Sequence, residues 1–382
     1  MKSMLPLSLY IHIPWCVRKC PYCDFNSHPQ RGEIPEAQYI QTLMADLENL
    51  LPKVWGRPVS SIYFGGGTPS LFSAKGIDEI LAGVRSRLML EPQCEITLEA
   101  NPGTVEHDRF EAYREAGVNR ISMGIQSFDN ALLERLGRIH NGDEACLAIE
   151  AVKAAGFQRF NLDLMHGLPD QDLAMALHDI RTALRFEPPH LSHYQLTIEP
   201  NTAFAAQPPV LPEDDALDDI QEQSHQRLRD AGLEHYEVSA WSLPGEPSRH
   251  NMNYWQYGDY LGIGAGAHGK ITELSSGKVW RYGRQRHPNR YLAAQNSGEW
   301  NGEERYLEAD DRLFEFFFNG LRLREGVNLK HLSERARLSQ TKVQAALDEA
   351  QGRGLLVIDD ERAQATDLGW RFMNDLQGIF LP

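Results

Sequence analysis

Short apolar runs alternate with amphipathic stretches through the first half of the chain. The apolar runs are rich in β-branched and aromatic residues, which favours strands, and the stretches between them have the apolar spacing of helices. The pattern predicts an α/β fold in which a parallel sheet is covered by helices. Six units are too few for a closed eightfold barrel, so we expect a curved, partly open (βα)6 barrel. The expected strands are residues 9–13, 59–64, 94–99, 120–125, 159–164 and 190–198, and the expected helices are residues 35–51, 73–88, 105–116, 130–137, 143–155 and 173–186.

The second half of the chain has a less regular pattern. A Pro-rich connector at residues 204–212 precedes an acidic amphipathic helix at 214–231 and a seventh strand candidate at 234–241. We expect three domains: the barrel at residues 1–240, a connecting region at 241–305 and a small α+β unit at 306–382. Three helices followed by a hairpin predict a winged-helix-like fold for this last unit, with helices at 312–323, 329–336 and 340–351, strands at 355–358 and 363–366, and a final helix.

Polar residues of unusual type follow the expected strands of the barrel. The glycine-rich segment 65–69 (GGGTP) follows the second strand, and glycines let a backbone approach a ligand and point N–H groups at it. Binding residues in such folds gather at the carboxyl ends of the strands. The sequence therefore predicts a site on one rim of the barrel, where the strand ends also carry Glu99, Gln126 and Asp163.

The first strand is followed by three cysteines, Cys16, Cys20 and Cys23, in a C-x3-C-x2-C pattern. A four-iron cluster is usually held by four thiolates, one for each iron. Three cysteines from one loop can hold three irons and leave the fourth open to the amino and carboxylate groups of S-adenosylmethionine (SAM). The spacing therefore favours a [4Fe-4S] cluster that binds SAM.

Zinc and a disulfide are the two alternatives for these thiols. Structural zinc commonly uses two C-x2-C pairs, but the other cysteines, Cys94 and Cys146, are isolated in the sequence. Three cysteines cannot all pair, and no secretory signal precedes them. Both alternatives therefore fit the spacing less well than the cluster does.

The composition and charge of the chain exclude several classes of protein. The chain has 382 residues, of which 42% are hydrophobic and 24% charged, as in a soluble globular protein. Its formal net charge of −15 argues against nonspecific nucleic-acid binding, which needs a basic face. No apolar run is long enough for a transmembrane helix, and the first residues do not resemble a signal peptide. Five cysteines, three of them in the cluster motif, indicate a reducing compartment, so we expect a cytoplasmic protein, with peripheral membrane contact through a partner still open.

A second chemical feature is the segment 249–255, RHNMNYW, which places a histidine beside two aromatic residues. Histidine is a common axial ligand of haem iron, and Tyr254 and Trp255 could pack on a porphyrin face. A buried histidine that caps the following loop is the alternative interpretation. The glycine-rich loop at 260–269 does not predict a dinucleotide site, because no βαβ unit surrounds it.

At the cysteine motif, with Tyr22 before its last cysteine, the chain resembles the radical SAM superfamily. The surrounding sequence resembles the family of oxygen-independent coproporphyrinogen III oxidase and its haem-chaperone relatives. The resemblance implies that Cys16, Cys20 and Cys23 hold the cluster, and that His250 of the HNxxYW segment is the first-choice haem ligand, with His268 and His166 as alternatives. The residues that it implies for SAM are Tyr10, Gly66, Gly67, Thr68, Glu99, Gln126, Arg138 and Asp163.

Two departures separate this chain from the oxidase. The oxidase has a fourth cysteine two positions after the third, where this chain has Phe25, and it has an extended N-terminal segment, whereas nine residues precede Tyr10 here. The resemblance thus favours a haem chaperone that delivers haem to apo-haemoproteins, such as respiratory cytochromes or haem-storage proteins. Oxidative decarboxylation of coproporphyrinogen III is the first alternative, and radical chemistry on an unrelated substrate is the second. The sequence assigns no catalytic residue and no oligomeric state.

Overall fold

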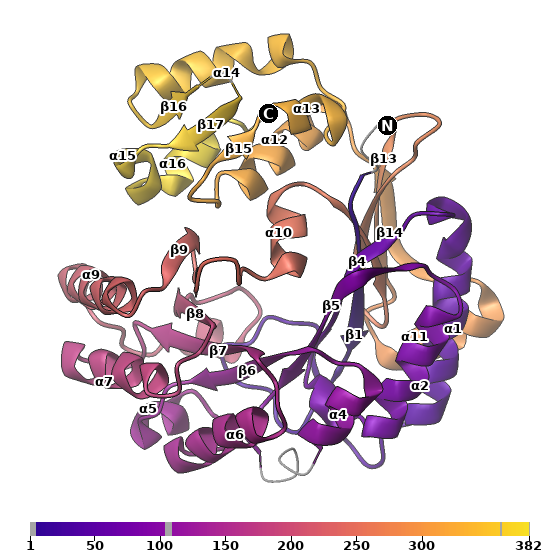
Figure 1. Ribbon diagram of the computed structural model, residues 1–382, viewed down its shortest axis with the longest axis horizontal. Coiled ribbons are helices and arrows are strands. Elements are labelled where there is room, and N and C mark those ends of the chain that lie inside the picture. Colours follow the sequence, from indigo (N-terminus) through magenta and orange to yellow (C-terminus); the bar gives the residue numbers. More distant parts are fainter. Residues whose placement is uncertain (1–4, 104–108, 360, 382) are drawn as a thin grey trace.

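The computed structural model describes residues 5–103, 109–359 and 361–381, and it is built around one large mixed sheet (Figure 1). The strand order is β14-β13-β12-β11-β1-β4-β5-β6-β7-β8-β10-β9, with separate strands at the two edges, so the sheet is an open barrel. Neighbouring strands from β1 to β8 pair in parallel, which confirms the expected (βα)6 unit. These strands are β1 (Leu7–Ile13), β4 (Val59–Gly66), β5 (Leu90–Ala100), β6 (Arg120–Gln126), β7 (Arg159–His166) and β8 (His190–Gln195).

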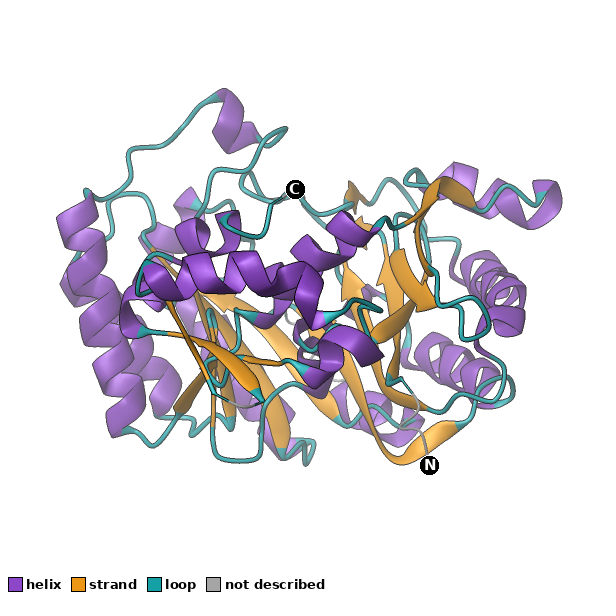
Figure 2. Ribbon diagram, turned by 90° about the horizontal axis from the view of Figure 1, so that it is seen from above, coloured by secondary structure: helices purple, strands orange, loops and turns teal. Residues whose placement is uncertain are grey.

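Helices cover the outer face of the parallel strands, and the view from above shows them flanking the sheet (Figure 2). Helix α1 (Glu36–Val54) is typical, because Leu43, Leu47 and Leu50 form one apolar stripe and are fully buried against the sheet. Part of the helix expected at 105–116 falls on residues 104–108, outside the described residues. The other helices of this layer are α2 (Ala74–Arg85), α4 (Phe110–Ala116), α5 (Asn130–Arg135), α6 (Gly142–Ala154), α7 (Leu173–Leu184) and α9 (Asp214–Asp230).

The sheet continues beyond the strands that the sequence predicted. The strand expected at 234–241 is a bulged hairpin of two strands, and the region expected only to connect two domains adds four strands to the other edge. Glycines at 262, 264, 266 and 269 weaken the strand signal there, although β11 pairs in parallel with β1. The added elements are β9 (Glu234–Glu237), β10 (Ala240–Ser242), α10 (Arg249–Trp255), β11 (Asp259–Ile263), β12 (His268–Thr272), β13 (Val279–Arg284), α11 (Pro288–Ser297) and β14 (Asn301–Tyr306).

The C-terminal unit, yellow in Figure 1, has a hydrophobic core of its own, in which Phe317 and Phe380 stack with ring centroids 4.0 Å apart. Its three-stranded sheet and helices have the expected winged-helix-like order. The elements are α12 (Ala309–Gly320), β15 (Val327–Asn328), α13 (Lys330–Glu334), α14 (Gln340–Gly352), β16 (Leu356–Ile358), β17 (Arg362–Ala365), α15 (Asp367–Arg371) and α16 (Met373–Gly378). The remaining short elements are β2 (Trp15–Cys16), β3 (His28–Pro29), η1 (Pro69–Leu71) and α8 (Ala203–Ala206).

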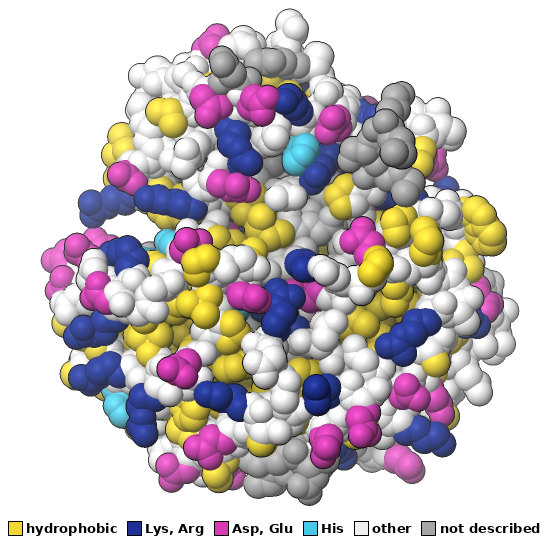
Figure 3. Space-filling model, viewed as in Figure 1, with side chains coloured by type: hydrophobic (Ala, Val, Ile, Leu, Met, Phe, Trp, Pro, Cys, Tyr) yellow, Lys and Arg dark blue, Asp and Glu magenta, His cyan; other side chains and the backbone are white. Residues whose placement is uncertain are grey.

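Charges of both signs are intermingled on the face shown in Figure 3, and they alternate there with hydrophobic side chains. This face therefore presents no continuous basic surface. Among the described helices, none combines the length and the apolar character that crossing a membrane would need.

Candidate functional site

A cavity of about 420 Å³ opens at the carboxyl ends of the parallel strands, and we call it the cysteine cavity. It brings together residues from the loop after β1 and from the ends of β4, β5, β6 and β7, as the rim interpretation expects. Ten residues singled out from the sequence line it: Cys16, Cys20, Cys23, Gly66, Gly67, Thr68, Glu99, Gln126, Arg138 and Asp163.

The cysteine loop is held at its base by a two-stranded parallel bridge. The backbone N–H of His28 donates to the carbonyl of Pro14 at 2.7 Å, and that of Gln30 donates to the carbonyl of Cys16 at 2.8 Å. All three thiols are free, and burial raises the pKa of Cys16 and of Cys23. A bound cation would have to supply the compensating charge before these thiols could act as thiolates.

The three thiols line one cavity. Among the described residues, no group of three His, Cys, Asp or Glu side chains is placed to hold a single metal ion. A cubane takes one thiolate on each iron, so its ligands stand apart. Arg138 donates from Nη1 to the Sγ of Cys20 at 3.7 Å and adds a positive charge beside the loop, which suits an anionic cluster. Three free thiols beside a guanidinium group are a donor set of the kind that an iron–sulfur cluster takes.

The glycine-rich loop forms a second wall of the cysteine cavity. Gly66 has φ +115°, and a Cβ on Gly67 would lie 2.3 Å from the carbonyl oxygen of Trp15. Only glycine allows this conformation and this close approach to the cysteine loop. The hydroxyl of Thr68 accepts a hydrogen bond from Asn101 at 2.9 Å, which ties the loop to the end of β5.

Glu99 is a carboxylate fixed inside the barrel. Its oxygens accept from the hydroxyl of Tyr63 at 2.8 Å and from the backbone N–H of Gly66 at 3.2 Å. Burial nevertheless raises the pKa of Glu99 to about 7, because desolvation disfavours the charged form. A cationic ligand such as an ammonium group would favour the charged carboxylate and bind to it.

Polar groups on β6 and β7 complete this rim. Asp163 accepts from Asn161 at 2.8 Å and from Ser122 at 3.2 Å, and burial raises the pKa of its carboxyl group. Gln126 has a positive φ of 65°, and its Oε1 is buried with no hydrogen-bond partner among the described residues. An unpaired buried acceptor is costly unless a ligand supplies a donor, so Gln126 suits a ligand contact.

A second cavity, of about 500 Å³, shares Gly66 and Glu99 with the cysteine cavity, and we call it the aromatic cavity. Asp24 and Phe25 also line both cavities. Aromatic and basic side chains from separate parts of the chain form the rest of the lining, and they include Tyr254, Trp255, Tyr257, Tyr260, His268, Lys270, Arg281 and Arg286. The aromatic cavity thus has an apolar body with cationic groups on its walls.

Tyr10 lines the aromatic cavity and not the cysteine cavity. Its hydroxyl lies 3.0 Å from the Nδ1 of His12, and its ring stacks on Tyr63 with centroids 6.3 Å apart. The predicted contact of Tyr10 with SAM stays a prediction, and in this structure Tyr10 stands on the far side of Glu99.

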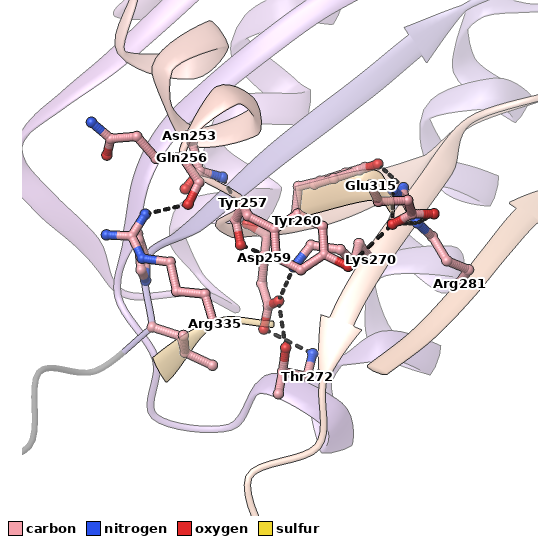
Figure 4. A network of polar contacts seen from close by, with 12 residues as sticks. Asn253, Gln256, Tyr257, Asp259, Tyr260, Lys270, Thr272, Arg281, Glu315 and Arg335 are labelled. Carbon is pink, nitrogen blue, oxygen red and sulfur yellow. Dashed lines mark hydrogen bonds and ion pairs between the residues drawn. The ribbon is translucent and has the colours of Figure 1, made fainter. Parts of the chain in front are cut away.

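The floor of the aromatic cavity is a network of buried polar groups (Figure 4). Asp259 is fully buried and pairs with Lys270 at 3.1 Å and with Arg57 at 2.9 Å. Arg281 pairs with Glu315 of α12 at 2.7 Å, so the network also joins the C-terminal unit to the sheet. These ion pairs neutralise the charges of Lys270 and Arg281 within the protein.

The three histidines considered for haem occupy different surroundings. His250 is buried, and its Nδ1 lies 3.0 Å from the hydroxyl of Ser61 while its Nε2 lies 2.8 Å from that of Tyr254. His166 is buried against His193, with ring centroids 4.2 Å apart. His268 alone of the three lines the aromatic cavity, and its side chain is 57% exposed. The choice of His250 as haem ligand stays a prediction.

Several residues of these cavities were missed from the sequence. Asn101 accepts from Arg138 at 2.6 Å and donates to Thr68, and its place directly after the third strand could have marked it. Tyr63 and Arg286 carry no comparable signal, because a strand tyrosine and a loop arginine are common. Only the fold brings them to the cavities.

Known proteins share this fold and segments of this sequence. Residues 10–180 match the radical SAM superfamily, and residues 307–372 match the HemN C-terminal domain. The chain resembles the structure of coproporphyrinogen III oxidase (HemN) from Escherichia coli with a TM-score of 0.82 at 22% identity, covering 98% of this chain and 90% of that one. The fold and site thus define a radical SAM protein of the HemN-like fold.

Two curated relatives that match the whole chain define the family within this class. The chain is 51% identical to heme chaperone HemW of Escherichia coli over 100% of both chains, and 51% identical to heme chaperone HemW of Haemophilus influenzae over 100% of this chain and 99% of that one. The chain belongs to the HemW family of haem chaperones, within the radical SAM superfamily.

Proposed function

We propose that Cys16, Cys20 and Cys23 hold a [4Fe-4S] cluster in the cysteine cavity, and that SAM binds beside it. The observation that carries this proposal is that the three free thiols, the close-approach glycines and Glu99 line one cavity. The cluster, when bound, would supply an open iron for SAM and an electron. The superfamily match to residues 10–180 supports the same assignment.

The residues of the chain have separate tasks in this proposal. Gly66 and Gly67 give the ligand access to the backbone, and the Glu99 carboxylate pairs with its ammonium group. Arg138 places a positive charge beside Cys20 and so favours the anionic state of the cluster. Gln126 and Asp163 complete the polar contacts on the same rim. The predicted SAM contact of Tyr10 would require a ligand that extends past Glu99 into the aromatic cavity.

The cargo proposed for this protein is haem, which it binds and delivers to apo-haemoproteins such as respiratory cytochromes or haem-storage proteins in the cytoplasm. Two relatives that match the whole chain are named heme chaperones. Phe25, where the oxidase has a cysteine, is 59% exposed and lines both cavities, so it offers an apolar contact between the cluster and a planar ligand. No catalytic residue is assigned.

One anaerobic experiment tests both parts of this function. The reconstituted chain is incubated with SAM and either haem or coproporphyrinogen III, and the optical spectrum and products are followed. We expect a cluster absorbance, stable haem binding and transfer to an apo-cytochrome, without protoporphyrinogen formation. Stoichiometric protoporphyrinogen would establish the oxidase activity instead, and absence of haem binding would overturn the chaperone function.

A further inference from the structure

The HNxxYW segment places its histidine outside the lining of both cavities. His250 is 1% exposed, lines neither cavity, and has hydroxyl groups within hydrogen-bond distance of both ring nitrogens. Iron ligation by either nitrogen would therefore require breaking a buried hydrogen bond and opening the packed helix α10. In this structure His250 is within hydrogen-bond distance of the hydroxyl of Tyr254 and so orients that side chain, which lines the aromatic cavity.

His268, at the start of β12, has the opposite surroundings. Its side chain is 57% exposed, and its Nδ1 lies 3.7 Å from the carboxylate of Glu303 on β14. Its Nε2 has no hydrogen-bond partner among the described residues. Partial burial lowers the pKa of His268, so its imidazole is neutral at neutral pH and its lone pair is available. A carboxylate beside one ring nitrogen is a common way to orient the other nitrogen toward a metal.

The lining of the aromatic cavity carries charges of both signs, because Asp24 and Glu99 line it together with three basic side chains, and one of these basic side chains has no internal partner. Lys270 and Arg281 line it but are neutralised by Asp259 and Glu315. Arg286 lines it as well, is exposed, and forms no ion pair with any described residue. An arginine with no internal partner can pair with a carboxylate of a ligand.

The walls of this cavity suit a flat apolar body. Trp255 and Tyr257 come from α10 and the turn after it, and Phe25 comes from the cysteine loop. Asn319 of α12 completes the lining, so the C-terminal unit closes one side. A cavity of about 500 Å³ lies in the range of small-molecule sites.

We infer that the aromatic cavity is the haem seat, in which His268 ligates the iron through Nε2, Arg286 pairs with a propionate, and His250 is a positioning residue for Tyr254. This inference rests on the proposed haem-binding function. It also places haem against the wall, Gly66 and Glu99, that separates the aromatic cavity from the cysteine cavity.

The test is haem titration of the full chain, followed by optical and electron paramagnetic resonance spectroscopy. We expect His268→Ala to lose the histidine-ligated spectrum and to recover it when free imidazole is added, because the seat itself remains. We expect His250→Gln to keep the spectrum, since an amide can still bond to Ser61 and Tyr254. Unchanged circular dichroism in both variants shows that they are folded.

The propionate contact is tested with a matched pair of exposed arginines. Arg286→Gln should weaken haem binding roughly tenfold, whereas Arg290→Gln, on α11 and outside both cavities, should not. The difference should vanish with haem dimethyl ester, in which the propionates carry no charge.

The outcomes distinguish a failure of the proposed haem binding from a failure of the inferred haem site. If the unaltered chain binds no haem, the proposed function itself fails. If the chain binds haem but His268→Ala keeps the ligated spectrum, or if His250→Gln loses it while folded, the inference about the seat is overturned and the proposed function stands. Equal effects of Arg286→Gln and Arg290→Gln would likewise overturn the propionate contact.

Discussion

The two cavities share a wall and differ in how they are built. The cysteine cavity draws its residues from the carboxyl ends of successive parallel strands and from one loop, so its groups are close to elements that the sequence reveals. The aromatic cavity combines residues as far apart as Tyr10 and Asn319, and it rests on buried ion pairs. The difference teaches that the proposed cofactor site lies on the regular part of this fold, whereas the proposed haem site depends on tertiary assembly.

Substitution of a cysteine in the cysteine cavity should distinguish the functions of the two cavities most strongly. Cys20→Ser leaves two cluster ligands, so we expect the cluster to be lost and SAM binding with it. Haem binding should persist, because Cys20 does not line the aromatic cavity. Iron and sulfide content with Mössbauer spectroscopy measure the first effect, and haem titration the second. Cys146→Ser is the control, since Cys146 lies on the outer helix α6. A cluster that survives each of three single serine variants would contradict the assignment.

Removing the buried ion pairs of Asp259 should lower the stability of the protein and disturb the aromatic cavity. Asp259→Ala leaves Arg57 and Lys270 buried without their partner, so we expect a loss of about 3–5 kcal/mol in unfolding free energy. Denaturant unfolding measures it. Glu361→Ala removes an exposed partner of Lys330 and should cost about 0–1 kcal/mol. Equal losses in the two variants would show that the buried network has no special role.

Glu99 lies in the shared wall, and its titration should affect SAM. Its pKa of about 7 means that the unliganded carboxyl gains a proton as pH falls through 7, and the protonated form cannot pair with an ammonium group. We expect SAM affinity to fall up to tenfold per pH unit below pH 7 and to level off above it.

The matched variant for this prediction is Glu99→Gln. It should bind SAM roughly tenfold or more weakly at pH 8, by about 1.5–3 kcal/mol, and should lose the dependence on pH. Calorimetric titration of the cluster-loaded protein measures both. An unchanged pH profile in Glu99→Gln would assign the titration to another group.

The smallest expected effect concerns an aromatic wall. Trp255→Leu should weaken haem binding by about 0.5–1.5 kcal/mol, a few-fold in affinity, because one aromatic contact is lost. SAM binding should not change, since Trp255 does not line the cysteine cavity. Parallel titrations with both ligands check this. A change in SAM affinity of the same size would mean that the two cavities act as one site.

The sequence by itself determined the parallel half of the fold and ten residues of the cysteine cavity. Alternating apolar and amphipathic segments predict the strands from β1 to β8, and the cysteine spacing and GGGTP lie directly at strand ends. Local sequence sufficed because the residues at a strand's carboxyl end reach the same rim in any parallel sheet. The sequence did not reveal that β11 to β14 extend this sheet, because their glycines hide the strand pattern.

Only the tertiary structure decided what surrounds each histidine. Nothing in the letters RHNMNYW shows that the imidazole of His250 is enclosed between Ser61 and Tyr254. Nothing in the glycine-rich segment 260–269 shows that His268 faces a cavity. Burial and hydrogen-bond partners depend on segments far away in the chain, such as β4 at residue 61 and α12 at residue 319. A motif can name the residues able to ligate a metal, but packing determines which of their lone pairs is free.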